Sequence, residues 1–173
     1  MILASPGPVT AYRMHTPRWA SMPTSGAGAA THGGRVNRPG TSALYLALEA
    51  ETAIREYRQT STLLPPGTLV SYTVQVAPIV DFRNGYDPLA WSSLWEEFHC
   101  DWRALWFGQR LEPPSWALAD EVFAAGAKGI VFTSTLAAGG HILALYTDTL
   151  EIEDILKVHD PAGTLPKNQD SWR

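Results

Sequence analysis

The residues best suited to chemistry in this 173-residue chain lie in a glycine-rich segment and in the helix predicted to follow it. Two adjacent glycines precede Arg35, and such glycines let the backbone turn tightly and approach a ligand closely. An arginine in this setting can bind a carboxylate or a phosphate through parallel hydrogen bonds. Glu56 has no cationic neighbour three or four positions away, whereas Glu51 has Arg55 as an ordinary surface partner. Arg35 and Glu56 are therefore the first candidates for a site, with a loop ion pair and a solvated glutamate as the alternative interpretation.

Several common active-site signatures are absent from the sequence. Gly26-Ala27-Gly28 begins like a dinucleotide-binding fingerprint but lacks the third glycine, and no Gly-Lys-Ser/Thr occurs. Ser134 has no flanking glycines of the kind found around a hydrolase nucleophile, and no His-Glu-x-x-His is present. His99 and Cys100 are adjacent on a predicted helix, so they do not face one site and are interpreted as packing or surface residues. We predict no metal site, no covalent nucleophile and no bound cofactor.

Strands are predicted to dominate the middle and the end of the chain, with helices inserted between them. Residues 69–76 alternate in a way that is typical of a half-buried strand. Apolar residues in 49–59 recur at the helical spacing i, i+3, i+4, i+7. We therefore expect an α+β fold with mixed, largely antiparallel sheets. Further strands are expected at 43–46, 79–82, 129–133 and 142–146, a helix at 116–125 ending at Gly126, and either a strand or a helix at 150–158.

Three further segments are interpreted separately. Residues 1–11 are expected to be an irregular lead-in. Residues 20–41 are rich in Gly, Ala, Ser, Thr and Pro, and we interpret them as a shaped ligand loop because a strand and a helix follow at once. Aromatic residues keep helical spacing from Trp91 to Trp106, and core packing is the preferred interpretation of one or two helices there. Exposed aromatics of this stretch, or Trp172 in the tail, are candidates for a protein interface.

Composition limits the partners and the compartment of the protein. The chain has 13 Lys and Arg against 17 Asp and Glu, for a net charge of −4, and no basic run. Direct binding to nucleic acid or to an anionic membrane therefore has no support. A single cysteine, Cys100, excludes an internal disulfide and a cysteine-rich zinc site. Since neither a secretory signal nor a membrane-spanning run is found, we expect a cytoplasmic protein with a single domain over residues 1–173.

The order and spacing of several motifs resemble the RES domain. These motifs are Tyr12-Arg13, Gly33-Gly34-Arg35-Val36-Asn37 with Pro39-Gly40-Thr41, then Tyr45 and, eleven residues later, Glu56. The stretch from Leu118 to Ser134 resembles the segment that carries the family's serine. The resemblance runs from about Tyr12 to Tyr146, with the domain core at about 12–148. Val36 departs from it, because the family usually has a tryptophan at this position.

The resemblance implies a fold related to ADP-ribosyltransferases and a toxin that consumes NAD+ by cleaving its nicotinamide–ribose bond. It implies Arg35, Glu56 and Ser134 as catalytic residues, and Tyr45, Arg13, Gly34 and Asn37 as substrate-binding residues. NAD+ is then a substrate rather than a cofactor. It further implies a partner, a cognate Xre-type helix-turn-helix antitoxin, through which any contact with DNA would be made. Whether the toxin also forms a homodimer within that complex is left open.

The chemistry of NAD+ cleavage fits these residue types. Cleavage at the ribose C1′ passes through an oxocarbenium-like state, which a carboxylate such as Glu56 would stabilise. An arginine would neutralise the pyrophosphate, an aromatic ring such as that of Tyr45 would orient nicotinamide, and the Ser134 hydroxyl would bond the carboxamide or a ribose hydroxyl.

The sequence leaves the acceptor of the ADP-ribosyl group open. Water would make the protein a hydrolase, phosphate would make it a phosphorylase, and a protein side chain would make it an ADP-ribosyltransferase. A non-catalytic nucleotide-binding module is a further alternative.

Overall fold

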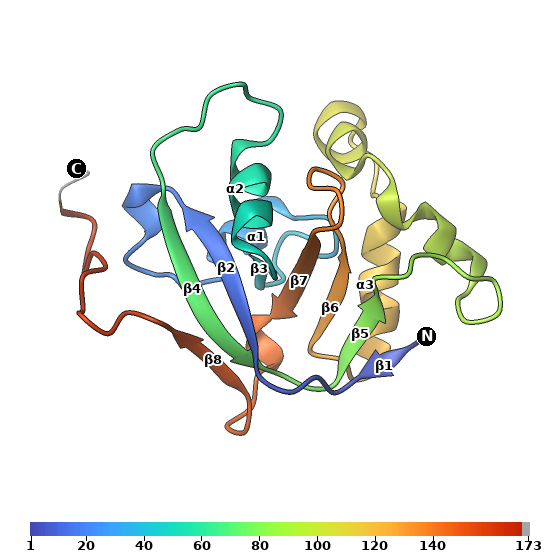
Figure 1. Cartoon of the computed structure of the whole chain (residues 1–173). Helices are drawn as coiled ribbons and strands as arrows, with labels where there is room; N and C mark the ends of the chain where they lie inside the picture. The colour runs from blue at the N-terminus through green and yellow to red at the C-terminus, as the bar shows by residue number, and fades with distance from the viewer. Residues whose placement is uncertain (171–173) are drawn as a thin grey trace.

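The strands of the computed structural model, which describes residues 1–170, join in a single sheet that is sharply bent (Figure 1). The strand order is β1-β5-β6-β7-β3-β2-β4-β8, and every neighbouring pair is antiparallel except β5 and β6. The strands are β1 (Leu3–Ala4), β2 (Val9–His15), β3 (Ala43–Ala47), β4 (Thr68–Gln75), β5 (Ile79–Phe82), β6 (Gly129–Thr133), β7 (His141–Tyr146) and β8 (Ile155–Val158). The α-helices are α1 (Ala27–His32), α2 (Ala50–Arg58) and α3 (Pro114–Ala124). The expected α+β class with largely antiparallel pairing is confirmed, in one sheet rather than several.

The bend in the sheet lies between β2 and β3. These strands pair only at Tyr12 and Ala47, whereas β2 and β4 pair along seven positions. Beyond that one pair β2 and β3 diverge, so the sheet folds over on itself. Its inner faces share a core in which Leu44, Leu46 and Leu143 meet Tyr72 and other residues of β4. The separation of β2 from β3 creates the space in which the candidate site lies.

The outer face of the half of the sheet that contains β5, β6 and β7 is covered by α3 and by the aromatic segment, residues 91–107 (Figure 1). Phe82 on β5 is in ring contact with Trp91, Trp95 and Phe98, with centroid distances of 4.6–5.0 Å. The core-packing interpretation of this stretch is therefore correct. Trp91, Trp95 and Trp102 are buried and unavailable for an interface, and Trp172 lies outside the described residues.

The aromatic segment differs from prediction in its backbone. Instead of regular α-helices it forms a 3-10 helix, η2 (Ser93–His99), and a π-helical turn, η3 (Ala104–Gln109). Residues three apart eclipse one another in a 3-10 helix, and the rings of Trp95 and Phe98 are accordingly parallel to within 3°. This arrangement lets both rings pack on Phe82, so tertiary contact overrides the helical spacing of the sequence.

Two further expectations need correction. Residues 1–11 are not an irregular lead-in, because β1 pairs with β5 and β2 already begins at Val9. Residues 20–41 are not a loop throughout, because α1 lies within them and ends where Gly33 adopts a φ of +79°.

The remaining elements are two short 3-10 turns, η1 (Pro17–Trp19) and η4 (Thr147–Thr149). Of the two alternatives expected for residues 150–158, the structure has the strand, β8. No helix within residues 1–170 is long and apolar enough to cross a membrane.

Candidate functional site

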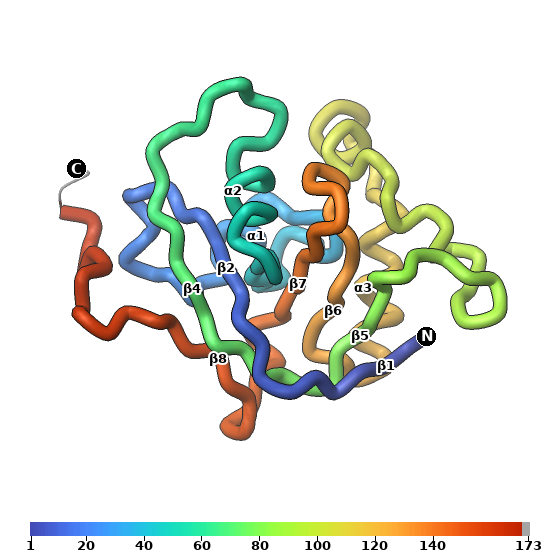
Figure 2. Tube along the Cα trace, viewed as in Figure 1, coloured from blue at the N-terminus to red at the C-terminus, as the bar shows by residue number. Residues whose placement is uncertain are grey.

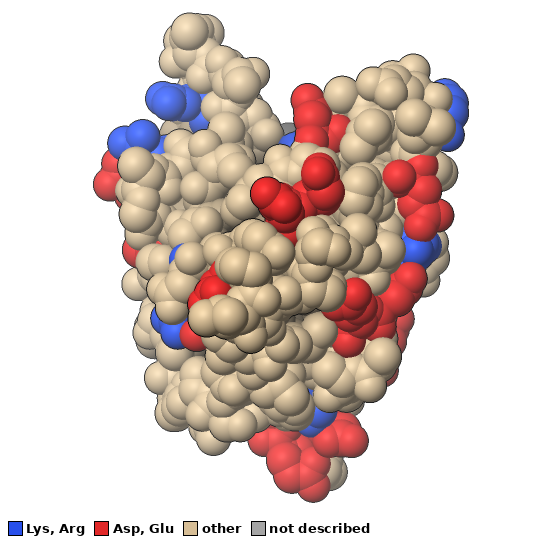
Figure 3. Space-filling model, turned by 90° about the vertical axis from the view of Figure 1, so that its right-hand side faces the viewer, with Lys and Arg blue, Asp and Glu red and all other residues tan. Residues whose placement is uncertain are grey.

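A cavity of about 470 Å³ opens where β2 and β3 diverge, and it collects most of the residues singled out in the sequence. The chain trace shows the segments after α2 and around η3 rising on opposite sides of the turn between β6 and β7 (Figure 2). In the space-filling view the molecule is notched at its upper edge, and acidic side chains lie beside and below the notch (Figure 3). Residues lining the cavity include Tyr12, Arg13, Gly34, Arg35, Tyr45, Glu56, Tyr57, Trp102, Arg103, Phe132 and Ser134.

Glu56 and Ser134 meet in this cavity although 78 residues separate them. The Ser134 hydroxyl donates to Glu56 Oε1 over 2.6 Å and accepts the backbone N–H groups of Leu136 and Ala137 at 3.0 Å each. Because both acceptor positions of the hydroxyl are occupied, its proton is directed at the carboxylate. No other hydrogen bond to the Glu56 carboxylate occurs within residues 1–170, so Oε2 is available to a ligand.

The Gly33-Gly34-Arg35 loop is held from within by Tyr45 and Asn37. The Tyr45 hydroxyl accepts the Val36 N–H at 3.0 Å and donates to Asn37 Oδ1 at 2.7 Å. The buried Asn37 amide nitrogen donates to the carbonyls of Ala29, Arg38 and Thr41. Burial raises the pKa of Tyr45, which keeps its hydroxyl protonated as a donor. Asn37 thus lies beneath the cavity, outside its lining, and shapes the loop that the other residues occupy.

The same loop is held from outside by three successive carbonyl contacts. Trp116 Nε1 donates to the Gly34 carbonyl at 2.7 Å, the Ser115 hydroxyl to the Arg35 carbonyl at 2.6 Å, and the Tyr146 hydroxyl to the Val36 carbonyl at 2.9 Å. Val36 is buried in the core that α3 covers. A side chain at this position therefore does not stack on a ligand.

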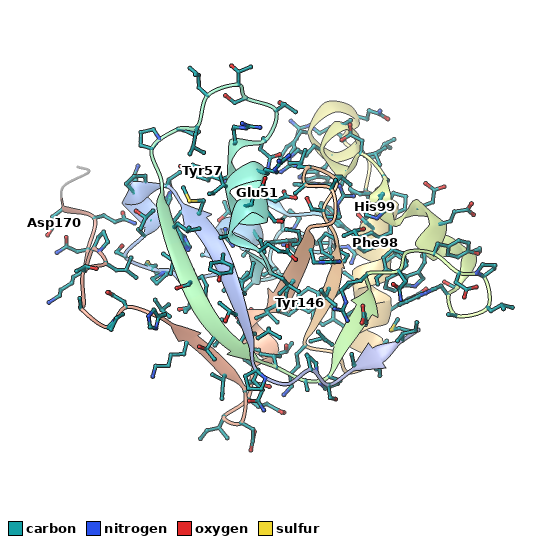
Figure 4. All side chains as sticks on the ribbon, viewed as in Figure 1. Glu51, Tyr57, Phe98, His99, Tyr146 and Asp170 are labelled. Carbon is teal, nitrogen blue, oxygen red and sulfur yellow. The ribbon has the colours of Figure 1, made fainter. Side chains whose placement is uncertain are left out.

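Arg35 reaches across the cavity to the aromatic segment. Its Nη1 donates to the carbonyls of Phe98 and Cys100, at 3.0 and 3.1 Å. Burial lowers the pKa of the guanidinium, while the nearby Glu56 carboxylate acts in the opposite direction. In Figure 4, Phe98 and His99 lie on one side of the molecule and Tyr57 of α2 on the other. Arg35 is therefore anchored to the Phe98–Cys100 side of the cavity through Nη1, and no hydrogen bond from its Nη2 or Nε occurs within residues 1–170.

Three arginines give the cavity a local excess of positive charge. Arg13 donates to the Tyr45 carbonyl at 3.2 Å across the gap between β2 and β3, and burial lowers its pKa. The guanidinium of Arg103 packs over the Trp102 ring, 4.5 Å from its centroid. None of Arg13, Arg35 and Arg103 forms a salt bridge within the described residues. Unpaired arginines in a recess attract an anionic ligand.

The structure brings six of the seven predicted site residues to the cavity wall: Arg13, Gly34, Arg35, Tyr45, Glu56 and Ser134. The wall also contains Tyr57, Trp102, Arg103 and Phe132, which sequence reasoning missed. Arg103 carried a weak signal, as a cation beside a tryptophan in an otherwise aromatic stretch. His99 and Cys100 contribute no cation site, and no group of three or more potential metal ligands occurs in residues 1–170.

Comparisons with known proteins found one matching family model and a solved structure with a similar fold. The family model of the RES domain matches residues 10–168. A solved structure, described as the crystal structure of the M. tuberculosis MbcT-MbcA toxin-antitoxin complex, contains a chain that is 21% identical to this one, with a TM-score of 0.56. The match covers 87% of this chain and 82% of that chain, and it shows a shared fold. No curated protein sequence matches this chain.

Proposed function

The chain belongs to the RES domain family, and on that premise we propose that it is the toxin of a toxin–antitoxin pair that depletes NAD+. The observation that carries the proposal is a single cavity lined by Glu56, whose carboxylate is hydrogen-bonded by Ser134, together with Arg35 and Arg13. A dinucleotide with an anionic pyrophosphate and a cationic nicotinamide ribose suits a recess that combines unpaired arginines with one carboxylate.

The proposed reaction breaks the bond between the nicotinamide nitrogen and the ribose C1′. The bonding electron pair leaves with nicotinamide, which becomes neutral and needs no proton. The ribose carbon gains positive charge in the transition state, as in glycoside hydrolysis. When water is the acceptor, its oxygen forms the new bond to C1′, a proton passes from it to solvent, and the product is ADP-ribose. When phosphate is the acceptor, an unprotonated oxygen of the dianion forms this bond without loss of a proton, and the product is ADP-ribose 1″-phosphate, in which C1″ is the same carbon.

The residues take distinct roles in this step. Glu56 places its free carboxylate oxygen near C1′ or the ribose 2′-hydroxyl and stabilises the developing charge. Arg35 and Arg13 bind the pyrophosphate, and the Tyr45 ring forms the wall on which nicotinamide is oriented. Gly34 lets the backbone approach this ring, because a Cβ there would lie 2.5 Å from the Tyr45 hydroxyl oxygen. Asn37 acts as a positioning residue for the loop.

A toxin that depletes NAD+ must be inhibited in the cell that produces it. We propose that a cognate Xre-type helix-turn-helix antitoxin covers the cavity, which would make NAD+ binding and antitoxin binding mutually exclusive. The structural neighbour described as a toxin-antitoxin complex supports this partner class. Purified antitoxin should therefore suppress NAD+ loss when mixed with the active chain.

The direct test compares two glutamates of one helix. The chain freed of any partner is incubated with NAD+, with and without phosphate, and nicotinamide and ADP-ribose products are followed by chromatography. We expect Glu56→Gln to reduce nicotinamide release about 100-fold or more. Glu51→Gln is the matched control, because Glu51 lies on the same helix but pairs with Arg55 on the surface.

The outcomes separate the alternatives. Phosphate-dependent loss of NAD+ would identify a phosphorylase, and phosphate-independent loss a hydrolase. A labelled protein in lysate without loss of free NAD+ in the purified reaction would identify a protein ADP-ribosyltransferase. Full activity of a folded Glu56→Gln variant would refute the mechanism, and arrest of bacterial growth by Glu56→Gln as strong as that by the wild type would refute NAD+ depletion as the cause of toxicity.

A further inference from the structure

A second contact between α2 and the β6–β7 region lies two helical turns from Glu56. Glu49, the residue preceding α2, does not cap its own helix through a backbone N–H. Its Oε2 accepts the backbone N–H of His141 at 2.9 Å and the Thr52 hydroxyl at 2.9 Å, and its Oε1 lies 3.1 Å from His141 Nδ1. We call this arrangement of Glu49, Thr52 and His141 the clasp.

The clasp joins the same two pieces of structure as the Glu56–Ser134 hydrogen bond. His141 is the first residue of β7 and pairs with Thr133, the residue before Ser134. The turn between them is closed by a hydrogen bond from the Ser134 N–H to the Gly140 carbonyl at 2.8 Å. Glu49 and Glu56 are seven residues apart, so both lie on one side of α2 about 10 Å from each other. Two separated contacts define the orientation of a helix, whereas one would leave it free to pivot.

The turn between β6 and β7 also packs closely against the start of α2. A Cβ at Gly140 would collide with the Thr52 hydroxyl, so the backbone of the turn lies directly against the first turn of α2. The Leu48 N–H donates to the His141 carbonyl at 3.0 Å, which continues the connection to the end of β3. Hydrogen bonds from His141 and Thr52 lower the pKa of the Glu49 carboxyl against the opposing effect of burial, so it remains ionised at neutral pH.

We propose that Glu49 is a positioning residue, which sets the distance between the Glu56 carboxylate and the Ser134 hydroxyl by anchoring the start of α2 to His141. This inference rests on the proposed function for its effect on catalysis, and on geometry alone for its effect on structure. Misplacement of a catalytic group by about 1 Å can cost about 100-fold in rate. Loss of the clasp should therefore lower kcat while leaving KM for NAD+ nearly unchanged, since the arginines that bind the pyrophosphate are attached elsewhere.

The test uses three variants in the NAD+ assay. Glu49→Ala is expected to lower kcat by about tenfold or more, with KM changed less than about twofold. Glu49→Gln is expected to restore most of kcat, because the amide oxygen can accept from the His141 N–H and from Thr52 while the amide NH₂ donates to Nδ1 of a neutral imidazole. Glu51→Ala removes the same charge from the same helix at an exposed position and is the control. A Glu49→Ala enzyme with the kcat of Glu51→Ala would overturn the proposal, even if its Tm were lower.

A structural readout keeps this inference separate from the proposed function. The unfolding equilibrium constants of the wild type, Glu49→Ala, Ser134→Ala and the double variant are measured in urea. If the clasp positions the Glu56–Ser134 bond, the double variant should depart from the product of the single effects by about threefold or more. If the wild type does not cleave NAD+, the proposed function fails, but this double-mutant cycle still tests whether Glu49 positions the Glu56–Ser134 hydrogen bond. Independent effects of the two substitutions on the unfolding equilibrium would overturn the positioning role of Glu49.

Discussion

Replacing Gly34 by alanine should disrupt the internal hydrogen bonds of the loop that shapes the candidate site. A Cβ at this position would lie 2.5 Å from both Asn37 Oδ1 and the Tyr45 hydroxyl oxygen, and 2.9 Å from Tyr45 Cζ. These atoms belong to the internal hydrogen bonds of the loop and cannot rotate away, because Asn37 also donates to three backbone carbonyls. The new methyl group must therefore separate Tyr45 from Asn37.

The cost follows from two contributions. Overpacking of a well-packed site typically costs about 1–3 kcal/mol. Loss of the 2.7 Å hydrogen bond between Tyr45 and the buried Asn37 adds about 1–3 kcal/mol, because an acceptor is left without its partner. We expect the free energy of unfolding to fall by about 2–6 kcal/mol in total. Since 1 kcal/mol corresponds to about 2–4 °C in a domain of this size, Tm should fall by about 4–24 °C.

The assay is thermal and urea unfolding followed by circular dichroism, together with nicotinamide release from NAD+. Gly28→Ala is the matched control, because Gly28 also lines the cavity but has no atom within 4 Å of a Cβ. Alanine is favoured over glycine within a helix such as α1, so this control should keep or raise Tm. A Gly34→Ala protein with the Tm of the wild type to within about 2 °C would refute the steric argument.

Two further perturbations test other parts of the structure. Ser134→Ala should lower the free energy of unfolding by about 1–3 kcal/mol, because two backbone N–H groups lose their acceptor. It should also reduce nicotinamide release. Unchanged values in urea unfolding and in the NAD+ assay would contradict the role of this hydroxyl. The Tyr72 hydroxyl donates to the Pro23 carbonyl at 2.8 Å, so it accepts from Nε2–H of His15 at 2.7 Å. Burial lowers the pKa of His15 to about 4, so the unfolded chain binds more protons than the folded chain between about pH 6.5 and 4. The contribution of His15 to the free energy of unfolding should be complete above pH 6.5 and should decline by up to roughly 3 kcal/mol as the pH falls toward 4. Urea unfolding across that range measures this decline, which should be smaller in His15→Gln. An equal decline in both proteins would assign it to other groups.

Local pattern was enough to predict most of the strands. Residues 69–76 alternate because one side of β4 faces the shared core and the other faces solvent, and β4 spans Thr68–Gln75. The helix around Glu56 was likewise predicted, and α2 spans Ala50–Arg58. Strand β1 was missed because a two-residue edge strand has no period to detect and exists through its pairing with β5. The helical spacing from Trp91 to Trp106 predicted packing correctly but not the backbone, because the rings compete for contact with Phe82.

The sequence by itself determined which residue types are available for chemistry and in which order they occur. Gly33-Gly34-Arg35, Tyr45 and Glu56 lie within 24 consecutive residues, and their spacing carried the resemblance to the RES domain. That spacing also implied a loop, a strand and a helix, because each has a pattern that is visible in neighbouring residues even where remote contacts hold it in place. Glu56 has no cationic neighbour on its helix, so the sequence left open whether it is solvated or has a partner from elsewhere in the chain.

Only the tertiary structure decided what that partner is and how the site is closed. Ser134 reaches Glu56 because the register of β6 with β7 places the turn after Thr133 beside α2. The role of Asn37 beneath the cavity was equally invisible, since its acceptor and donor contacts depend on how the loop folds over Tyr45. Contacts between segments that are remote in sequence are set by sheet register and by the bend between β2 and β3, and neither leaves a periodic signal in the residues themselves.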